Sequence, residues 1–128
     1  MLDIPPIRRR PRWRKYKTAG GRSPVDEYID TLSDFDAAEI AAGMAIVKRD
    51  GLSAARHLVG AIYEVRVNGY DQIYRILFAP VGKRQSIFLA LEGFSKKTQK
   101  TPPAKIDLAQ QRLRDWNRRG IARRLFGR

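Results

Sequence analysis

The sequence of 128 residues contains no cysteine and only one histidine, His57. Without cysteine the chain cannot form disulfide bonds, thiolate metal sites or a cysteine nucleophile. A lone histidine is usually structural, so we do not expect His57 to be a catalyst. No glycine-rich phosphate loop, zinc-ligand spacing or Ser-His-Asp order is present, so we predict no metal and no cofactor.

Long apolar runs are also missing from the sequence. No stretch approaches the ~18 apolar residues of a membrane span, and the beginning of the chain lacks the apolar core of a signal peptide. Hydrophobic residues nevertheless make up 43% of the chain, which excludes disorder throughout. The length suits one compact domain with a single core. We therefore expect a soluble, cytoplasmic protein.

Positive charge is abundant but unevenly distributed along the chain. The net charge is +13, of which residues 1–18 carry +6, residues 19–93 carry −2 and residues 94–128 carry +9. Basic ends of this kind usually bind a polyanion, either a nucleic acid or an acidic protein, although they can simply keep a small domain soluble. We predict a domain over residues 12–117, between two mobile basic arms at residues 1–11 and 118–128.

The first half of the chain predicts a strand followed by two helices. A strand is expected over residues 12–17, before a glycine turn that begins at residue 18. Ser23, followed by Pro24 and Asp26, is a helix N-terminus, and that helix should run to about residue 32. Ser33 with Asp36 repeats the pattern, and Asp50-Gly51 ends the second helix.

The second half predicts three strands and a last helix. Extended patterns cover residues 63–67, 72–79 and 86–91, with a tight turn at Asn68-Gly69 and a break after Pro80. Thr101 with Pro102 then opens a helix. The fold class is α+β, with an antiparallel sheet and the order strand, two helices, three-strand meander, helix.

A lysine-rich run, Gly93-Phe94-Ser95-Lys96-Lys97-Thr98-Gln99-Lys100-Thr101-Pro102, follows the last predicted strand. It contains three lysines, several polar donors and no acid. Such a segment attracts a phosphate-rich ligand.

Three segments together resemble the phage-derived, HigB-like branch of the RelE/ParE toxin superfamily. They are Tyr63-Glu64-Val65-Arg66, Tyr74-Arg75-Ile76 and the lysine-rich run. The resemblance covers about residues 12–117 and implies a RelE-like fold. It also implies the toxin of a type II toxin-antitoxin pair, which cleaves mRNA on the ribosome without a metal and so inhibits translation. The attacking group in such cleavage is the 2′-hydroxyl of the RNA.

Cations placed around one phosphate could serve this chemistry. Arg66 and Arg75 should be cross-strand neighbours, and their planar guanidinium groups could clamp a phosphate. The alternative for Arg66 is an ion pair with Glu64 or Glu92. For Arg75 we favour the functional interpretation, because a cation in the middle of a sheet needs a reason.

The lysine-rich run supplies the other candidate residues. Lys96, Lys97 and Lys100 could follow an RNA backbone, and any one of them could act as the base. Phe94 could stack on a splayed base or pack under the last helix. The remaining candidate RNA-binding residues are Ser95, Thr98 and Gln99. Glu64 and Glu92 are conceivable bases, although a carboxylate among cations is more often an ion-pair partner.

Two alternatives to the nuclease remain open. One is a ParE-like toxin that inhibits DNA gyrase by binding, and the other is a nucleic-acid-binding module of a phage or plasmid. Either toxin interpretation implies an antitoxin from a neighbouring gene, in the HigB-like case often a helix-turn-helix protein, with a charge that complements the basic surface.

Overall fold

The computed structural model describes residues 10–126, which form an α+β fold with one mixed sheet. The helices and strands are β1 (Arg12–Lys15), α1 (Pro24–Asp30), α2 (Asp34–Asp50), β2 (Arg56–Val59), β3 (Ile62–Asn68), β4 (Ile73–Val81), β5 (Ile87–Lys96) and α3 (Pro103–Phe126). The strand order is β1-β5-β4-β3-β2. Only β1 and β5 pair in parallel, and the other neighbours are antiparallel. This arrangement confirms the predicted RelE-like fold class.

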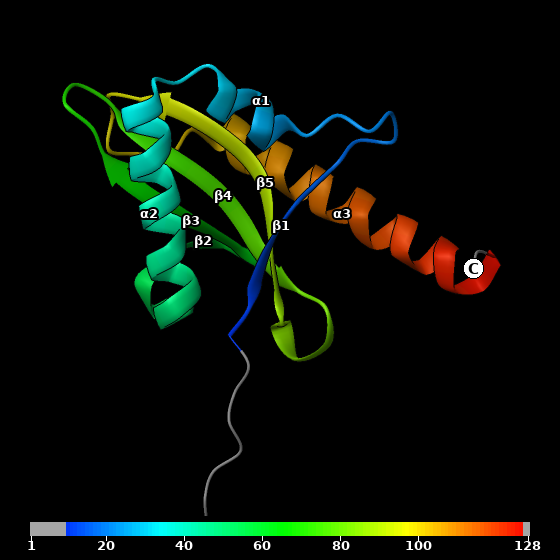
Figure 1. Ribbon diagram of the computed structural model, residues 1–128. Helices are drawn as coiled ribbons and strands as arrows, with labels where there is room; N and C mark the ends of the chain where they lie inside the picture. The colour runs from blue at the N-terminus through cyan, green and yellow to red at the C-terminus, as the bar shows by residue number, and fades with distance from the viewer. Residues whose placement is uncertain (1–9, 127–128) are drawn as a thin grey trace, which may run out of the picture.

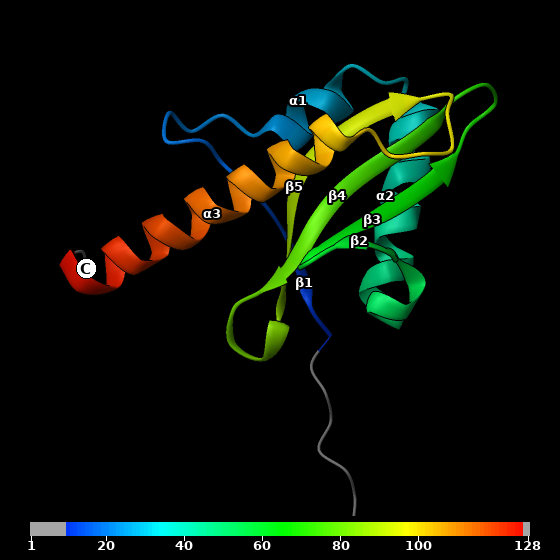
Figure 2. The same ribbon diagram turned by 180° about the vertical axis from the view of Figure 1, so that it is seen from behind.

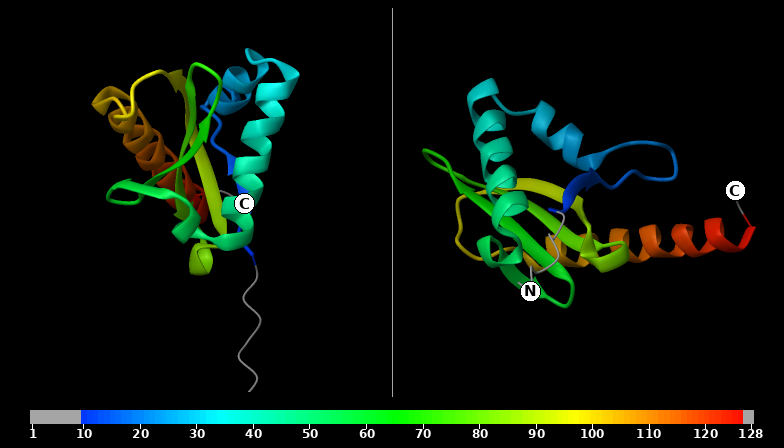
Figure 3. Two further views of the ribbon diagram at one scale, coloured as in Figure 1. Left: turned by 90° about the vertical axis from the view of Figure 1, so that its left-hand side faces the viewer. Right: turned by 60° about the horizontal axis from the view of Figure 1, so that its bottom comes forward.

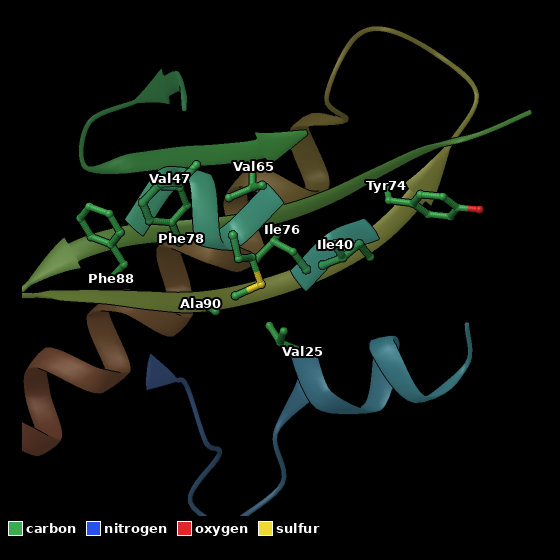
Figure 4. Close-up of a cluster of buried hydrophobic side chains, with 10 residues drawn as sticks. Val25, Ile40, Val47, Val65, Tyr74, Ile76, Phe78, Phe88 and Ala90 are labelled. Atoms are coloured by element: carbon green, nitrogen blue, oxygen red, sulfur yellow. The ribbon is translucent and has the colours of Figure 1, made fainter. Parts of the chain in front are cut away.

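Helices cover both faces of the sheet, as Figures 1 and 2 show from opposite sides. α1 and α2 lie on one face, where the core contains Val25, Ile40, Val65, Ile76 and Phe78 (Figure 4). α3 lies on the other face, and its Ala109 is buried against residues of β4 and β5. Because β4 and β5 are buried on both faces, they read as nearly continuous apolar runs rather than as alternating patterns.

The predicted helix N-termini are confirmed. The Ser23 hydroxyl accepts a hydrogen bond from the Asp26 amide, and the Ser33 hydroxyl accepts one from the Asp36 amide. Each of these bonds satisfies one of the amides that a helix leaves without a partner at its start. α2 ends at Asp50, and Gly51 follows with a φ of 82°, which favours glycine.

A bulge in β5 decides which side chains face α3. Leu77 pairs with Glu92 and Phe78 pairs with Ala90, so Leu91 is an extra residue in β5. As a result, Leu91 joins the core under α3, and the next residue, Glu92, also interacts with α3.

Several predicted boundaries are wrong. β2 was not predicted, because it is a short edge strand whose side chains are mostly exposed. β4 continues through Pro80 to Val81, since its pairing with β3 ends at Phe78 and a proline there removes no hydrogen bond to β3. β5 continues to Lys96 instead of ending at residue 91.

The last helix is longer than predicted and takes in the first part of the predicted C-terminal arm. Residues 118–126 continue α3, which projects beyond the sheet (Figure 3). Asp115 forms ion pairs with Arg118 and Arg119, three and four residues later, and such pairs stabilise a helix that has no clear apolar period. Residues 1–9, which make up most of the predicted N-terminal arm, and residues 127–128 lie outside the described part. Within residues 10–126, no helix is both long and apolar enough to span a bilayer.

Tyr74 anchors α2 to the sheet, and its ionisation offers a test of that contact. Its hydroxyl donates to Asp36 Oδ2 at 2.8 Å, and this hydrogen bond, together with burial, raises the pKa of Tyr74 to about 12. In the unfolded chain, the Tyr74 hydroxyl ionises near pH 10. Its contribution to the stability of the fold is therefore present below about pH 10 and is lost between about pH 10 and 12. We expect Tyr74→Phe to remove the most alkaline phase of the tyrosinate absorbance titration. The control variant Tyr70→Phe, which changes an exposed tyrosine, should retain that phase. If the phase persisted in Tyr74→Phe, it could not belong to Tyr74.

Candidate functional site

The candidate site lies on the α3 face of β3 and β4. Arg66 and Arg75 are direct cross-strand partners, as predicted. Glu64 lies two positions before Arg66 on the same face, because successive side chains of a strand alternate between faces. The segment from Thr98 to Thr101 connects β5 to α3 and covers these three side chains.

Glu64 is the centre of this buried charge cluster. Its side chain is fully buried and accepts hydrogen bonds from Arg66 Nε, at 2.9 Å, and from the hydroxyl of Thr101. Its carboxylate also lies 3.6 Å from Arg75 Nε and 3.9 Å from Arg56 Nε. A single carboxylate therefore faces three arginines, which agrees with its predicted role as an ion-pair partner.

Arg75 is also fully buried. Its Nη2 donates to the backbone carbonyls of Thr98 and Gln99, the latter at 3.0 Å. Its Nε and Nη1 have no hydrogen-bond partner among the described residues, although Nε faces Glu64. Burial, followed by the neighbouring charge of Arg66, lowers the pKa of Arg75. In this conformation Arg75 holds the loop backbone and does not reach the protein surface.

Arg66 makes the ion pair that we considered as the alternative to a phosphate clamp. Its side chain is 11% exposed and binds Glu64. It also donates to the backbone carbonyl of Gln99 at 2.6 Å and to the side-chain Oε1 of Gln99 at 3.2 Å. Arg66 and Arg75 therefore both hold the loop that follows β5.

Lys96, Lys97 and Lys100 are exposed and lie at the end of β5 and on the loop that the arginines hold. Within residues 10–126, no carboxylate forms an ion pair with any of these lysines. The structure therefore has two layers here, with buried arginines beneath and exposed lysines above. The exposed layer is the one that an anion can contact.

The other predicted RNA-binding residues divide between surface and core. Thr98 and Gln99 are exposed, whereas the Ser95 hydroxyl is hydrogen-bonded to the Tyr28 hydroxyl at 2.6 Å. Phe94 is 5% exposed and packs in the α3-side core. Its ring centroid lies 5.6 Å from the Arg75 guanidinium and 5.3 Å from Lys105 Nζ. Phe94 therefore packs under the last helix, which is one of the two interpretations that we considered.

Glu92 and His57 have structural contacts. Glu92 binds Lys105 at 2.9 Å and Arg112 at 3.2 Å, which ties α3 to β5. The His57 ring is hydrogen-bonded to the Gly60 carbonyl across a tight turn. Among residues 10–126, neither side chain forms an ion pair or a hydrogen bond with the exposed lysines.

Sequence reasoning did not identify Thr101 and Arg56 as members of the cluster. Both depend on contacts between distant segments, and Thr101 showed only as the start of a helix. The exposed position of Tyr70 was also not predicted. It is fully exposed at the turn between β3 and β4, and this turn lies at the same end of the sheet as Lys96 because Ile73 pairs with both Asn68 and Lys96 (Figure 2).

Side chains that could hold a metal ion are scattered over the described part of the chain. Among residues 10–126, three or more histidine, aspartate or glutamate side chains do not gather at any point. The cluster that the fold does build has one carboxylate and three arginines, and such a donor set favours anions near it rather than cations.

These features define a small α+β domain with exposed lysines held over buried arginines. The chain belongs to the family described as phage derived protein Gp49-like (DUF891), whose model matches residues 27–114. The matched range includes β3, β4 and β5, and also residues 97–102, which we call the lysine-rich loop. A search of curated proteins found no match.

Proposed function

We propose that this protein is the toxin of a type II toxin-antitoxin pair and that it cleaves mRNA on the ribosome. The observation that carries the proposal is the presence of exposed lysines, without acidic partners in the described chain, on a loop that two arginines fix from beneath. Membership in the phage-derived Gp49-like family supports the proposal. The resemblance of the chain to RelE and HigB toxins supports it as well.

The proposed reaction is attack of the RNA 2′-hydroxyl on the adjacent phosphorus. The 2′-oxygen loses its proton and bonds to phosphorus, the bond from phosphorus to the 5′-oxygen breaks, and that oxygen takes up a proton. One of Lys96, Lys97 and Lys100 takes the 2′-proton as a neutral amine. The other two, as ammonium groups, bind the phosphate and stabilise the doubly charged phosphorane, and one of them gives its proton to the 5′-oxygen.

Arg75 and Arg66 act in this proposal as positioning residues. Because their guanidinium groups hold the carbonyls of Thr98 and Gln99, they fix the direction in which Lys97 and Lys100 project. Fixed cations stabilise a transition state better than mobile ones, since little reorganisation remains when charge develops. Thr98 and Gln99 lie exposed beside the lysines as further RNA contacts.

An antitoxin with an acidic surface is the expected protein partner. The net charge of +13 favours such a partner electrostatically. In a HigB-like pair it is often a helix-turn-helix protein from the same operon. Co-purification of the chain with the product of its neighbouring gene checks this expectation.

The test of the proposed function is induction in a bacterial host, followed by primer extension on a reporter mRNA. We expect translation-dependent cuts with the unaltered chain. Lys97→Ala/Lys100→Ala should reduce the cuts by at least about a hundredfold, the scale of losing preorganised charge stabilisation. Both lysines are exposed, so the melting temperature should not change.

A matched control is Lys48→Ala/Lys83→Ala, which removes two exposed lysines from other parts of the described chain. It should cleave like the unaltered protein. Equal loss of cuts in both variants would indicate a general charge effect and contradict the site. Growth arrest with intact mRNA and induced DNA-damage signalling would contradict the nuclease and favour gyrase inhibition.

A further inference from the structure

A second basic feature lies far from the lysine-rich loop. It is a groove of about 550 Å³ between the end of β1, the loop that follows it and the C-terminal half of α3. Arg123 lies twenty residues after the start of α3, which places it about 30 Å along the helix axis from the loop end. We call this feature the basic groove, and its lining includes Arg14, Lys15, Lys17, Asp26, Trp116, Arg119 and Arg123.

The lining of the basic groove has an excess of positive charge. Five of its residues are cationic, and only Asp26 is acidic. Lys15 is paired with Asp26 at 2.5 Å, and Arg119 is paired with Asp115. The other three cations, Arg14, Lys17 and Arg123, form no ion pair within residues 10–126. The groove therefore has positive charge available for an anionic ligand.

The basic groove follows an edge of the sheet. β1 is the last strand in the sheet order, and β5 is its only neighbour among the described residues. Arg14 and Lys15 are consecutive, so their side chains point to opposite faces of β1, and yet both line the groove. Asp26 of α1 and Trp116 of α3 also line it, and these helices cover opposite faces of the sheet, so the groove lies beside the open edge of β1.

The open edge carries backbone groups that an extended chain can pair with. The amides of Arg12 and Tyr16 donate to Ser86 and Ala90 of the β5 side, at 3.0 and 2.9 Å. Because amide directions alternate along a strand, the amides of Trp13 and Lys15 point away from β5. Unpaired edges of this kind accept an added strand from another polypeptide.

We propose that the basic groove binds an extended, acidic segment of a partner protein, which pairs with β1 and places carboxylates beside Arg14, Lys17 and Arg123. A polypeptide fits better than RNA, because only a polypeptide backbone can continue the hydrogen-bond ladder of β1. Trp116, which also packs against the α3-side core, provides a rigid apolar wall for the alternate side chains. This site goes beyond the proposed mRNA cleavage and does not depend on it.

The test measures binding of two labelled probes to the full chain by fluorescence anisotropy. The first is a peptide of about ten residues, the upper length of an ordinary strand, in which Glu alternates with Val and Thr. The second is an oligouridine of about ten nucleotides, which reports binding of single-stranded RNA. Lys17→Glu/Arg123→Glu should weaken peptide binding by at least about tenfold, the ratio expected for 1.4 kcal/mol.

The matched control is Lys97→Glu/Lys100→Glu, which makes the same change in net charge at the lysine-rich loop. It should leave peptide binding within about twofold, well below the tenfold that corresponds to 1.4 kcal/mol. Equal weakening of the peptide by both variants would overturn the proposal as a general polycation effect. Loss of the oligouridine from the groove variant, with the peptide unaffected, would overturn it in favour of RNA.

Hydrogen exchange tests the strand pairing separately. On addition of the peptide, the amides of Trp13 and Lys15 should exchange more slowly, whereas those of Arg12 and Tyr16 are already bonded and should change little. Unchanged exchange at Trp13 and Lys15 in a peptide-saturated sample would overturn the pairing. Because neither readout uses RNA cleavage, failure of the proposed nuclease leaves both outcomes interpretable.

Discussion

Glu64→Gln is expected to lower the free energy of unfolding by about 3–5 kcal/mol, the range for breaking a buried ion pair. Glutamine keeps the shape of the side chain but removes the carboxylate that faces Arg75 and Arg66. Arg75 is fully buried, so its charge would lose its compensation without gaining water. Urea denaturation monitored by circular dichroism measures the change.

Arg75→Met removes the other partner of the same buried ion pair. In this variant Glu64 keeps Arg66 and Thr101 as partners. We expect this variant to lose less stability than Glu64→Gln. The double variant Glu64→Met/Arg75→Met should recover part of the loss, since apolar side chains of similar volume can replace a buried ion pair. If Glu64→Gln costs no more than Arg75→Met, Glu64 is not the centre of the cluster.

Gly93→Ala is expected to cost about 1–3 kcal/mol, the range for overpacking a core. Gly93 lies inside β5 and faces the ring of Tyr28 from α1. A Cβ atom there would lie 2.3 Å from Tyr28 Cδ2 and 2.9 Å from Tyr28 Cγ. The ring cannot simply move away, because its hydroxyl is bonded to Ser95. Thermal and urea unfolding both measure the loss.

Two variants separate a steric clash from a general effect of alanine. Gly20→Ala places a Cβ no closer than 3.9 Å to Thr18 Oγ1 and should change stability by less than about 0.5 kcal/mol. In a Tyr28→Ala background, Gly93→Ala should lose most of its cost, because the clashing ring is gone. An undiminished cost in that background would place the strain elsewhere.

Local signals predicted most of the fold. Ser23 and Ser33 start the two helices because their hydroxyls accept hydrogen bonds from amides of the first turn. These hydrogen bonds join residues only a few positions apart, so the local sequence is sufficient to predict them. The end of β5 was harder to predict, because Gly93 reads as a strand breaker. Its lack of a side chain is instead required by Tyr28, which lies 65 positions away in the sequence.

The candidate site was only partly predictable for the same reason. The cross-strand register of Arg66 and Arg75 follows from a hairpin, so the sequence was sufficient to predict it. The burial of Arg75 depends on where the loop at Thr98 and Gln99 returns over the sheet. The cost of burying a charge then gives Arg75 its positioning role, since a buried guanidinium needs the carboxylate and the carbonyls that surround it.

The parallel pairing of β1 with β5 has a consequence for how the chain is completed during synthesis. Trp13 pairs with Phe88, 75 positions later, so β1 has no sheet partner until most of the chain has been made. At ~5–20 residues per second, the interval is several seconds. The hairpin of β3 and β4 can form during this interval, because its strands are adjacent in sequence. Docking of the N-terminal strand is therefore expected to be a late event, which follows the emergence of β5.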